Sequence, residues 1–380
     1  NRRRKDINPE GVVRSRYGKA AQQPEKALCC PIDYDPRYLK KLPEEILKKD
    51  YGCGDPSRYV REGDVVLDLG SGGGKICYMA AQLVGEQGRV IGVDMNDDML
   101  GLARQYVDAM AEKIGGQRVE FHKGKIEDLA LSLETAEAWL AENPIHSSTD
   151  LLRYEAWARD ERAARPMIAD NSVDLIVSNC VLNLVGKPQR GQLISEIFRV
   201  LKPGGRVAIS DIVSDEHVPE HLQNDPTLWS GCISGAFQEE EFLEAFNAAG
   251  FAAVAYDKWD ASPWQVVEGI EFRSVTLTAT KPAGTECIDR GHAVIYKGPF
   301  SSVWDDEGHE FPRGQRMAVC ERTFQYLTTG PLATSFIGIS PEVLRDPVEW
   351  CAPSGTVRPA TETKGGIHEG ESCTPGGSCC

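Results

Sequence analysis

Hydrophobic residues between positions 65 and 213 gather in short apolar runs that alternate with stretches of helical period. The runs typical of strands are 65–69, 89–94, 118–122, 173–178 and 206–213. The stretches with apolar residues every three or four positions are about 75–84, 97–113 and 189–201. Strands joined through helices form right-handed crossovers. We therefore predict an α/β fold whose parallel sheet is covered on both faces.

The pattern changes after the last of these strands. A helix is predicted at about 238–249, ending at Gly250, and two alternating segments follow at 251–259 and 270–280 with nothing helical between them. Two such segments form an antiparallel pair. The sheet is therefore expected to be parallel with an antiparallel last strand.

The remaining segments divide the chain further. Residues 1–60 are mixed and rich in loops, with a helical stretch near 39–49, and are expected to form an N-terminal substrate-binding segment ahead of the sheet domain at 61–282. Within that domain, about 130–168 is rich in Glu, Ala and Arg and predicts two surface helices split at Asn143-Pro144. We interpret this insert as a solvated helical excursion, with a lid or an oligomer contact as the alternative.

Two parts follow the sheet domain. Residues 283–340 predict a small C-terminal domain with strands at 292–296 and 316–320 and a turn at 304–308 between them. Residues 341–380 are rich in Gly, Pro, Thr and Glu and end in a cysteine-containing segment. Such a composition predicts a flexible tail.

The strand at 65–69 runs directly into a glycine-rich turn with the spacing Asp68-x-Gly70-x-Gly72-x-Gly74. Glycines at a strand-to-helix turn let the backbone approach a nucleotide-like cofactor. A pyrophosphate would be repelled by Asp68, whereas a cationic cofactor that carries an amino acid is favoured, and S-adenosylmethionine fits this description. The next strand ends in Asp94, where a carboxylate can accept both ribose hydroxyls. A glycine-rich surface turn would not explain two acids at two strand ends.

Charge and hydropathy narrow the class of partner. The 380 residues have a formal net charge of −15, and Arg2–Lys5 is the one visible basic cluster. Phosphate contacts carry most non-specific affinity for nucleic acids, so we expect no nucleic-acid partner. No apolar run approaches the roughly eighteen residues that span a bilayer. We expect a soluble, monomeric, cytoplasmic protein.

Cysteine is unusually frequent for a chain without secretory features. The twelve cysteines lie at 29, 30, 53, 77, 180, 232, 287, 320, 351, 373, 379 and 380. None forms a Cys-x-x-Cys pair or has the Cys/His spacing of a zinc module, which disfavours structural zinc. Cys180 directly follows the strand that ends at Asn179, so its thiol is expected on the rim of the sheet beside the cofactor's sulfonium.

Other thiols can reach the same rim. Cys232 follows the fifth strand, Cys53 lies between two glycines, and Cys29 and Cys30 lie upstream of it. Each of them, taken alone, is also explained as a small buried hydrophobic residue. Three thiolates without histidine would form a soft trigonal site. Zinc normally takes a fourth ligand, whereas pyramidal trivalent arsenic takes three.

Several motifs together resemble the S-adenosylmethionine-dependent arsenite methyltransferases, over most of residues 25–330. The motifs are Tyr51–Gly54, Asp68–Gly70, Gly124–Leu129, Ser178–Asn183, Leu201–Gly205 and Trp229–Cys232. The cysteine-ending tail is similar to that of animal and algal members. The chain departs from the family pattern in the 130–168 insert and in Ser71–Lys75. The resemblance implies a Rossmann-like class I methyltransferase sheet and a role in arsenic detoxification.

The resemblance also implies roles for individual residues. Cys180 and Cys232 would hold As(III) with Cys53 as the third ligand, and Cys29 or Cys30 would exchange disulfides with Cys53 during turnover. Thioredoxin or glutathione would then reduce the enzyme. Asp68 would face the cofactor's ammonium group, Asp94 its ribose, and Ile126 and Glu127 its adenine. The further cofactor-binding residues expected on this basis are Gly70, Ser71, Gly72, Met95 and Asn179.

The reaction would need little acid–base assistance. Arsenic held by thiolates directs its lone pair at the sulfonium methyl group, and the main requirement for such an in-line displacement is positioning. Two other functions stay open at this stage. The chain is also compatible with a methyltransferase for a small organic acceptor, or with a thiol-rich metalloid-binding protein that retains a vestigial cofactor fold.

Overall fold

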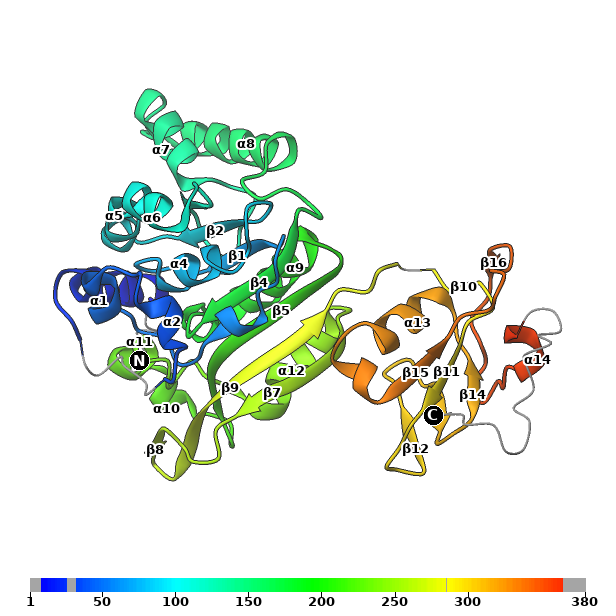
Figure 1. Cartoon of the computed structure of the whole chain (residues 1–380). Coiled ribbons are helices and arrows are strands. Elements are labelled where there is room, and N and C mark those ends of the chain that lie inside the picture. The colour runs from blue at the N-terminus through cyan, green and yellow to red at the C-terminus, as the bar shows by residue number, and fades with distance from the viewer. Residues whose placement is uncertain (1–7, 26–31, 285, 365–380) are drawn as a thin grey trace. The chain divides into compact units, whose positions relative to one another are not determined.

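The computed structural model describes residues 8–25, 32–284 and 286–364, and the chain divides into two units between Lys281 and Pro282 (Figure 1). The first unit is built on a nine-stranded sheet whose main path has the order β3-β2-β1-β4-β5-β9-β7. The strands of this path are β1 Val65–Leu69, β2 Arg89–Asp94, β3 Val119–Lys123, β4 Val173–Asn179, β5 Leu201–Ser214, β7 Ala252–Trp259 and β9 Ile270–Thr280. Two short strands, β6 Phe237–Gln238 and β8 Gln265–Val267, pair with β5 and β9.

Strand directions agree with the sequence. Strands β1 to β5 pair in parallel, and β9 lies antiparallel between β5 and β7. The predicted parallel sheet with an antiparallel last strand is therefore confirmed. One boundary differs: β5 already begins at Leu201, so it includes the Pro-Gly-Gly that was expected to separate it from the preceding helix.

Helices cover both faces of the sheet because alternate strand residues point to opposite sides. The helices before the second unit are α1 Pro9–Gln22, α2 Pro36–Leu39, α3 Glu44–Lys48, α4 Lys75–Ala81, α5 Asp97–Gln105, α6 Val107–Ile114, α7 Leu133–Glu142, α8 Ser148–Ala164, α9 Arg190–Val200, α10 Glu220–Gln223, α11 Pro226–Ser230 and α12 Glu239–Ala248. Leu67 joins one apolar core with helices α9 and α12, and its neighbour Val66 joins a second core with α3 to α6. Among the described residues, none of the helices combines the length and apolar composition needed to cross a membrane.

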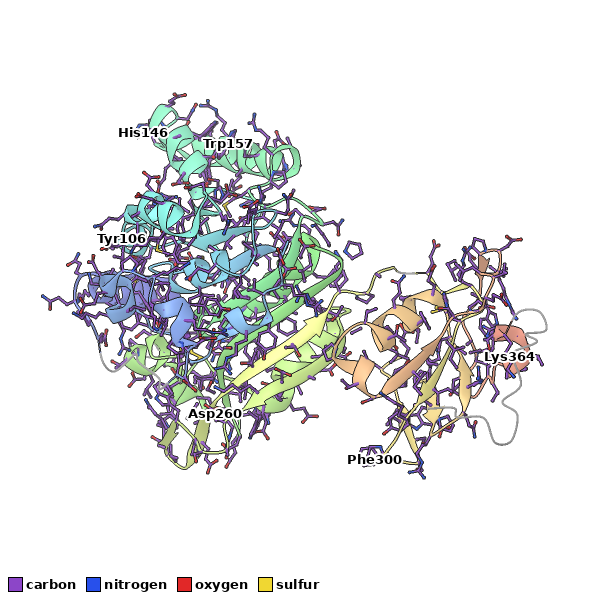
Figure 2. All side chains as sticks on the ribbon, viewed as in Figure 1. Tyr106, His146, Trp157, Asp260, Phe300 and Lys364 are labelled. Carbon is purple, nitrogen blue, oxygen red and sulfur yellow. A yellow bond between two sulfur atoms is a disulfide. The ribbon has the colours of Figure 1, made fainter. Side chains whose placement is uncertain are left out.

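Two helix predictions need correction. The expected helix at 97–113 is broken at Tyr106, labelled in Figure 2, into α5 and α6. Helix α1 was missed, because few of its side chains are buried and the apolar spacing is weak. Its start was nevertheless marked in the sequence: the side chain of Asn8 accepts a hydrogen bond from Gly11 N, and Pro9 occupies the first helical position.

The insert forms the expected helical pair, α7 and α8, which stands at the β3 end of the sheet (Figure 1). The two helices meet through the rings of Trp139 and Trp157, which stack at a centroid distance of 5.0 Å. Ala136, Ala158 and Glu161 are the buried residues of the pair. Ion pairs such as Lys123 with Glu137 attach the insert to the sheet.

The second unit is a small β-rich fold. Its strands are β10 Ile288–Asp289, β11 Ala293–Tyr296, β12 Ser302–Trp304, β13 Glu310–Pro312, β14 Arg316–Ala318, β15 Phe336–Ile339 and β16 Val348–Glu349, and its helices are α13 Glu321–Thr328 and α14 Ala360–Thr363. The two expected strands pair antiparallel as β11 and β14. The turn at 304–308 does not join them directly, because it closes a separate hairpin of β12 and β13.

The expected flexible tail does not begin at residue 341. Strand β16 pairs with β10, and α14 extends the fold to Lys364, labelled in Figure 2. Arg358 is 4% exposed and donates to Asp289 at 2.8 Å. The polar composition of the segment after residue 341 did not predict this buried ion pair. Residues 365–380, with Cys373, Cys379 and Cys380, lie outside the described residues.

Candidate active site

A cavity of about 310 Å³ opens at the carboxyl ends of β1, β2, β3 and β4. This is the edge at which parallel α/β sheets bind ligands. All of the predicted cofactor-binding residues line it: Asp68, Gly70, Ser71, Gly72, Asp94, Met95, Ile126, Glu127 and Asn179. Cys180 also lines the cavity, so a cysteine borders the space that these residues enclose.

Asp68 gives the cavity wall an unusual carboxyl group. Its side chain is 2% exposed, and its Oδ2 accepts a hydrogen bond from Cys77 Sγ at 3.3 Å. Burial, with the nearby charges of Asp94 and Asp50, raises the pKa of Asp68 to about 7. A cation bound beside this group would favour its ionised form.

Asp94 holds its own loop in place. Its carboxylate accepts from the backbone N–H of Gly72 and of Asn96, both at 2.8 Å. A carboxylate has about four lone-pair sites, so Asp94 retains capacity for ligand hydroxyls. Ser71 Oγ is buried and has no hydrogen-bond partner among the described residues. A buried polar atom of this kind fits a cavity that binds a polar ligand.

Lys75 is the most conspicuous departure in the glycine-rich turn, and the structure explains how its charge is accommodated. Its ammonium group forms an ion pair with Asp50 at 2.8 Å and lies 3.5 Å from the centroid of the Tyr34 ring. Asp50 and Tyr34 belong to the N-terminal segment. Lys75 therefore anchors the N-terminal segment beside the cavity.

Asn179 lines the cavity, but its amide is engaged with the loop that carries Cys53. Its Oδ1 accepts from the N–H of Cys53 at 2.8 Å and of Gly54 at 3.0 Å, and its Nδ2 donates to Gly54 O at 2.8 Å. A Cβ atom at Gly52 would lie 2.0 Å from Asn179 Nδ2, so only glycine allows this approach. Asn179 thus fixes the position of Cys53 relative to β4.

The missed helix α1 forms another wall of the cavity through Asn8, Val13, Arg14 and Tyr17, among others. Arg16 on the same helix ties α1 to the chain near Cys232, donating to Ser230 Oγ at 2.9 Å. The Tyr17 hydroxyl is hydrogen-bonded to Cys232, and burial raises the pKa of this tyrosine. The N-terminal segment is therefore part of both the cavity and the thiol site.

Three of the five predicted thiols converge. Cys53, Cys180 and Cys232 are all buried in one apolar cluster. Cys53 and Cys180 form a disulfide, and Cys232 Sγ donates to Cys180 O at 3.3 Å. The disulfide partner of Cys53 here is thus Cys180. Cys29 and Cys30, one of which the family resemblance implies as the exchange partner of Cys53 during turnover, lie outside the described residues.

The backbone is strained at two of these thiols. Cys180 has φ 59° and Cys232 has φ 62°, a left-handed conformation that is uncommon for residues other than glycine. Strain of this kind costs on the order of 1–3 kcal/mol per residue and concentrates at functional sites. Both thiols are held in place at this cost.

Asp211 on β5 is the main residue that the sequence analysis missed. A carboxylate oxygen of Asp211 lies within 4.8 Å of the sulfurs of Cys53 and Cys180. Its carboxylate accepts from Asn183 Nδ2 and from Ile212 N, each at 2.8 Å. Burial raises its pKa to about 7. The available signal was an acid near the carboxyl end of a strand, the same signal that identified Asp68 and Asp94.

Comparison with known proteins identifies methyltransferases that are similar to this chain. A family model described as a methyltransferase domain matches residues 61–156 and 158–250, and one described as a domain of unknown function matches 283–368. The arsenite methyltransferase of Aquipseudomonas alcaligenes is 33% identical over 85% of this chain and 89% of its own length. The arsenite methyltransferase of Mus musculus is 31% identical over 86% of this chain and 78% of its own length.

A solved structure is also similar. The crystal structure of an arsenic(III) S-adenosylmethionine methyltransferase from Chlamydomonas reinhardtii superposes with a TM-score of 0.56 at 28% sequence identity. The match covers 86% of this chain and 100% of that chain.

Proposed function

The chain belongs to the arsenite methyltransferase family, and we propose that its active site transfers the methyl group of S-adenosylmethionine to trivalent arsenic held by Cys53, Cys180 and Cys232. The observation that carries this proposal is the convergence of three buried cysteines beside the cavity that the expected cofactor residues enclose.

The residues of the cavity fit the methyl donor. Asp68 would pair with its ammonium group, and Asp94 would accept hydrogen bonds from its ribose hydroxyls. Ile126 and Glu127 would flank its adenine. The Ser71 hydroxyl would form a hydrogen bond with one of its polar groups. Bound there, S-adenosylmethionine supplies an electrophilic methyl group on a sulfonium. Cys180 lines the same cavity and would hold the arsenic lone pair in line with that group.

The disulfide corresponds to the oxidised enzyme in this mechanism. Methyl transfer raises the oxidation state of arsenic, and two thiols return it to the trivalent form by becoming a disulfide. An external thiol, from thioredoxin or glutathione, would then reduce Cys53–Cys180 before the next arsenic binds. Cys29 or Cys30 would relay this exchange.

The proposal is tested with pre-reduced protein, methyl-labelled S-adenosylmethionine and arsenite. Label is expected in methylated arsenic species separated by chromatography. Bound arsenic with no transfer of label would instead identify a metalloid-binding protein. Label in an organic acceptor, with none in arsenic, would identify the other methyltransferase function.

Cofactor affinity should depend on pH through Asp68. With a pKa of about 7 in the free enzyme, this carboxyl is largely protonated below neutrality and must lose its proton to pair with the cofactor's ammonium group. The dissociation constant should therefore rise as the pH falls below about 7, by up to about tenfold per pH unit. Calorimetric titration between about pH 6 and 8 measures this slope.

Two variants identify the group responsible for the slope. Asp68→Asn should bind weakly with little pH dependence. Asp94→Asn should lose affinity through its ribose contacts, by roughly 1–3 kcal/mol per charged hydrogen bond, and keep most of the slope. An unchanged slope in Asp68→Asn would show that another group titrates.

Asp211 is proposed to move protons during arsenic capture. Each As–S bond forms as a thiol S–H and an As–OH bond break, and Asp211 would carry the proton from sulfur to the departing hydroxide, which leaves as water. Acid–base catalysis of this kind contributes on the order of a hundredfold. Asp211→Asn should slow single-turnover methylation by about that factor and leave cofactor affinity unchanged. Asp215→Asn, just beyond the end of β5, is the control, and equal rates for the two variants would exclude the relay.

A further inference from the structure

The second unit contains a separate group of thiols, formed by Cys287, Cys320 and Cys351. They come from three segments of the chain and none is in a disulfide. Cys287 lies directly before the first residue of β10, and Cys351 lies just beyond the last residue of β16. The antiparallel pairing of these strands sets Ile288 opposite Glu349, and Trp350 N donates to Cys287 O at 2.7 Å. The backbone itself therefore brings Cys287 and Cys351 to the same end of this two-stranded sheet.

The side chains meet as well. The thiols of Cys287 and Cys351 are hydrogen-bonded to each other. Arg322 Nη2 lies 3.5 Å from Cys287 Sγ and also forms an ion pair with Glu307 at 2.5 Å. Cys287 is half-buried and Cys351 is exposed. This pair is thus reachable from solvent, with a guanidinium beside one sulfur.

Cys320 has a different role in the group. It is 3% exposed and caps α13, where its Sγ lies 3.5 Å from Thr323 N and 3.3 Å from Thr323 Oγ1. A cavity of about 320 Å³ is lined by Glu286 and Ile288, the two neighbours of Cys287, and by Arg322, among others. Cys320 is buried, so the exposed Cys351 is the thiol of the group that solutes meet first.

We propose that Cys287 and Cys351 form a dithiol site that binds monosubstituted trivalent arsenic, R–As(OH)₂, apart from the methylation site. Such a species has two exchangeable oxygens, which matches two sulfurs. Two S–H and two As–OH bonds break, two As–S bonds form and two water molecules leave, so no oxidant or reductant is required. Soft thiol sulfur is the ligand that trivalent arsenic prefers over oxygen.

The placement of the two thiols defines the site. Cys287 is half-buried beside Arg322, and Cys351 is exposed. The site also requires neither the first unit's cavity nor a methyl donor, so it goes beyond the proposed methyl transfer.

The test uses the reduced full chain with phenylarsine oxide as the probe. Iodoacetamide alkylation is followed residue by residue by peptide mass spectrometry, with and without the probe. Cys287 and Cys351 should be protected together, with alkylation slowed at least about tenfold. In Cys351→Ser, Cys287 should lose its protection, because one sulfur cannot chelate. In Cys320→Ser, where serine still caps α13, protection should remain.

Contrary outcomes are equally specific. Equal alkylation of Cys287 with and without the probe would overturn the proposal, as would protection that persists in Cys351→Ser. Recovery of a Cys287–Cys351 disulfide after turnover without reductant would show a relay instead. Methylation by Cys351→Ser at the wild-type rate is expected in every case, which keeps this test separate from that of the methylation site.

Discussion

Cys180→Ser and Cys232→Ser should each abolish methylation of both arsenite and methylarsenite. Serine replaces a soft sulfur with a hydroxyl that stays protonated at neutral pH and binds arsenic poorly. Both positions also hold strained backbone that sets the direction of the sulfur. Loss of a correctly placed ligand should reduce the rate at least on the order of a hundredfold. Arsenic speciation with excess thiol reductant measures the effect.

Cys53→Ser separates the roles of the three thiols. Methylarsenite already carries one As–C bond and needs only two sulfur ligands, so this variant should lose arsenite methylation and retain part of its activity on methylarsenite. Cys320→Ser in the second unit is a buried control that should keep both activities. If Cys53→Ser and Cys180→Ser fail identically, all three thiols are ligands in every step. Wild-type rates for Cys180→Ser on both substrates would instead favour an organic acceptor.

Removal of external thiol reductant should stop the enzyme after about one turnover. In the structure the Cys53–Cys180 disulfide occupies two of the three proposed arsenic ligands. Protein isolated in this form should neither bind nor methylate arsenite until it is reduced. Pre-reduced protein, freed of reductant, should produce methylated arsenic in an amount equal to the enzyme and then regain the disulfide. Thiol titration before and after turnover, beside arsenic speciation, checks both statements.

The same experiment identifies the disulfide that matters. Cys53→Ser cannot form the Cys53–Cys180 bond, so its residual methylarsenite activity should need no initial reduction. Both cysteines are buried, and Asn179 holds the loop that carries Cys53. A reductant therefore reaches this disulfide through the cavity that Cys180 lines or after displacement of the loop. Many turnovers by pre-reduced wild-type enzyme without any reductant would contradict the proposed cycle.

Local patterns were sufficient for most of the methyltransferase sheet. The apolar runs that became β1, β2 and β4 are buried on both faces, so they are continuous in the sequence and easy to recognise. The acids at the ends of β1 and β2 are near the glycine-rich turn in sequence as well as in space. The cavity lining at Asp68 and Asp94 followed directly from these positions.

Features with weak local signals were missed or misplaced. Helix α1 buries few side chains, so the spacing of its apolar residues did not predict a helix. In the structure this helix forms one wall of the cavity. Arg358 and strand β16 lie in a segment whose composition is typical of flexible chain. Their order comes from partners such as Asp289, roughly seventy residues away, and composition carries no information about such partners.

The sequence by itself determined the main strands of the large sheet, the two acids of the cofactor site and the three cysteines to expect at the rim of the sheet. Each of these depends on periodicity or on position at a strand end, which neighbouring residues specify. Only the tertiary structure decided that Cys53 pairs with Cys180, that Asp211 lies beside both sulfurs, and that Cys287 meets Cys351. These contacts join residues far apart in the chain, and they form only because strand pairing and core packing bring their backbones together.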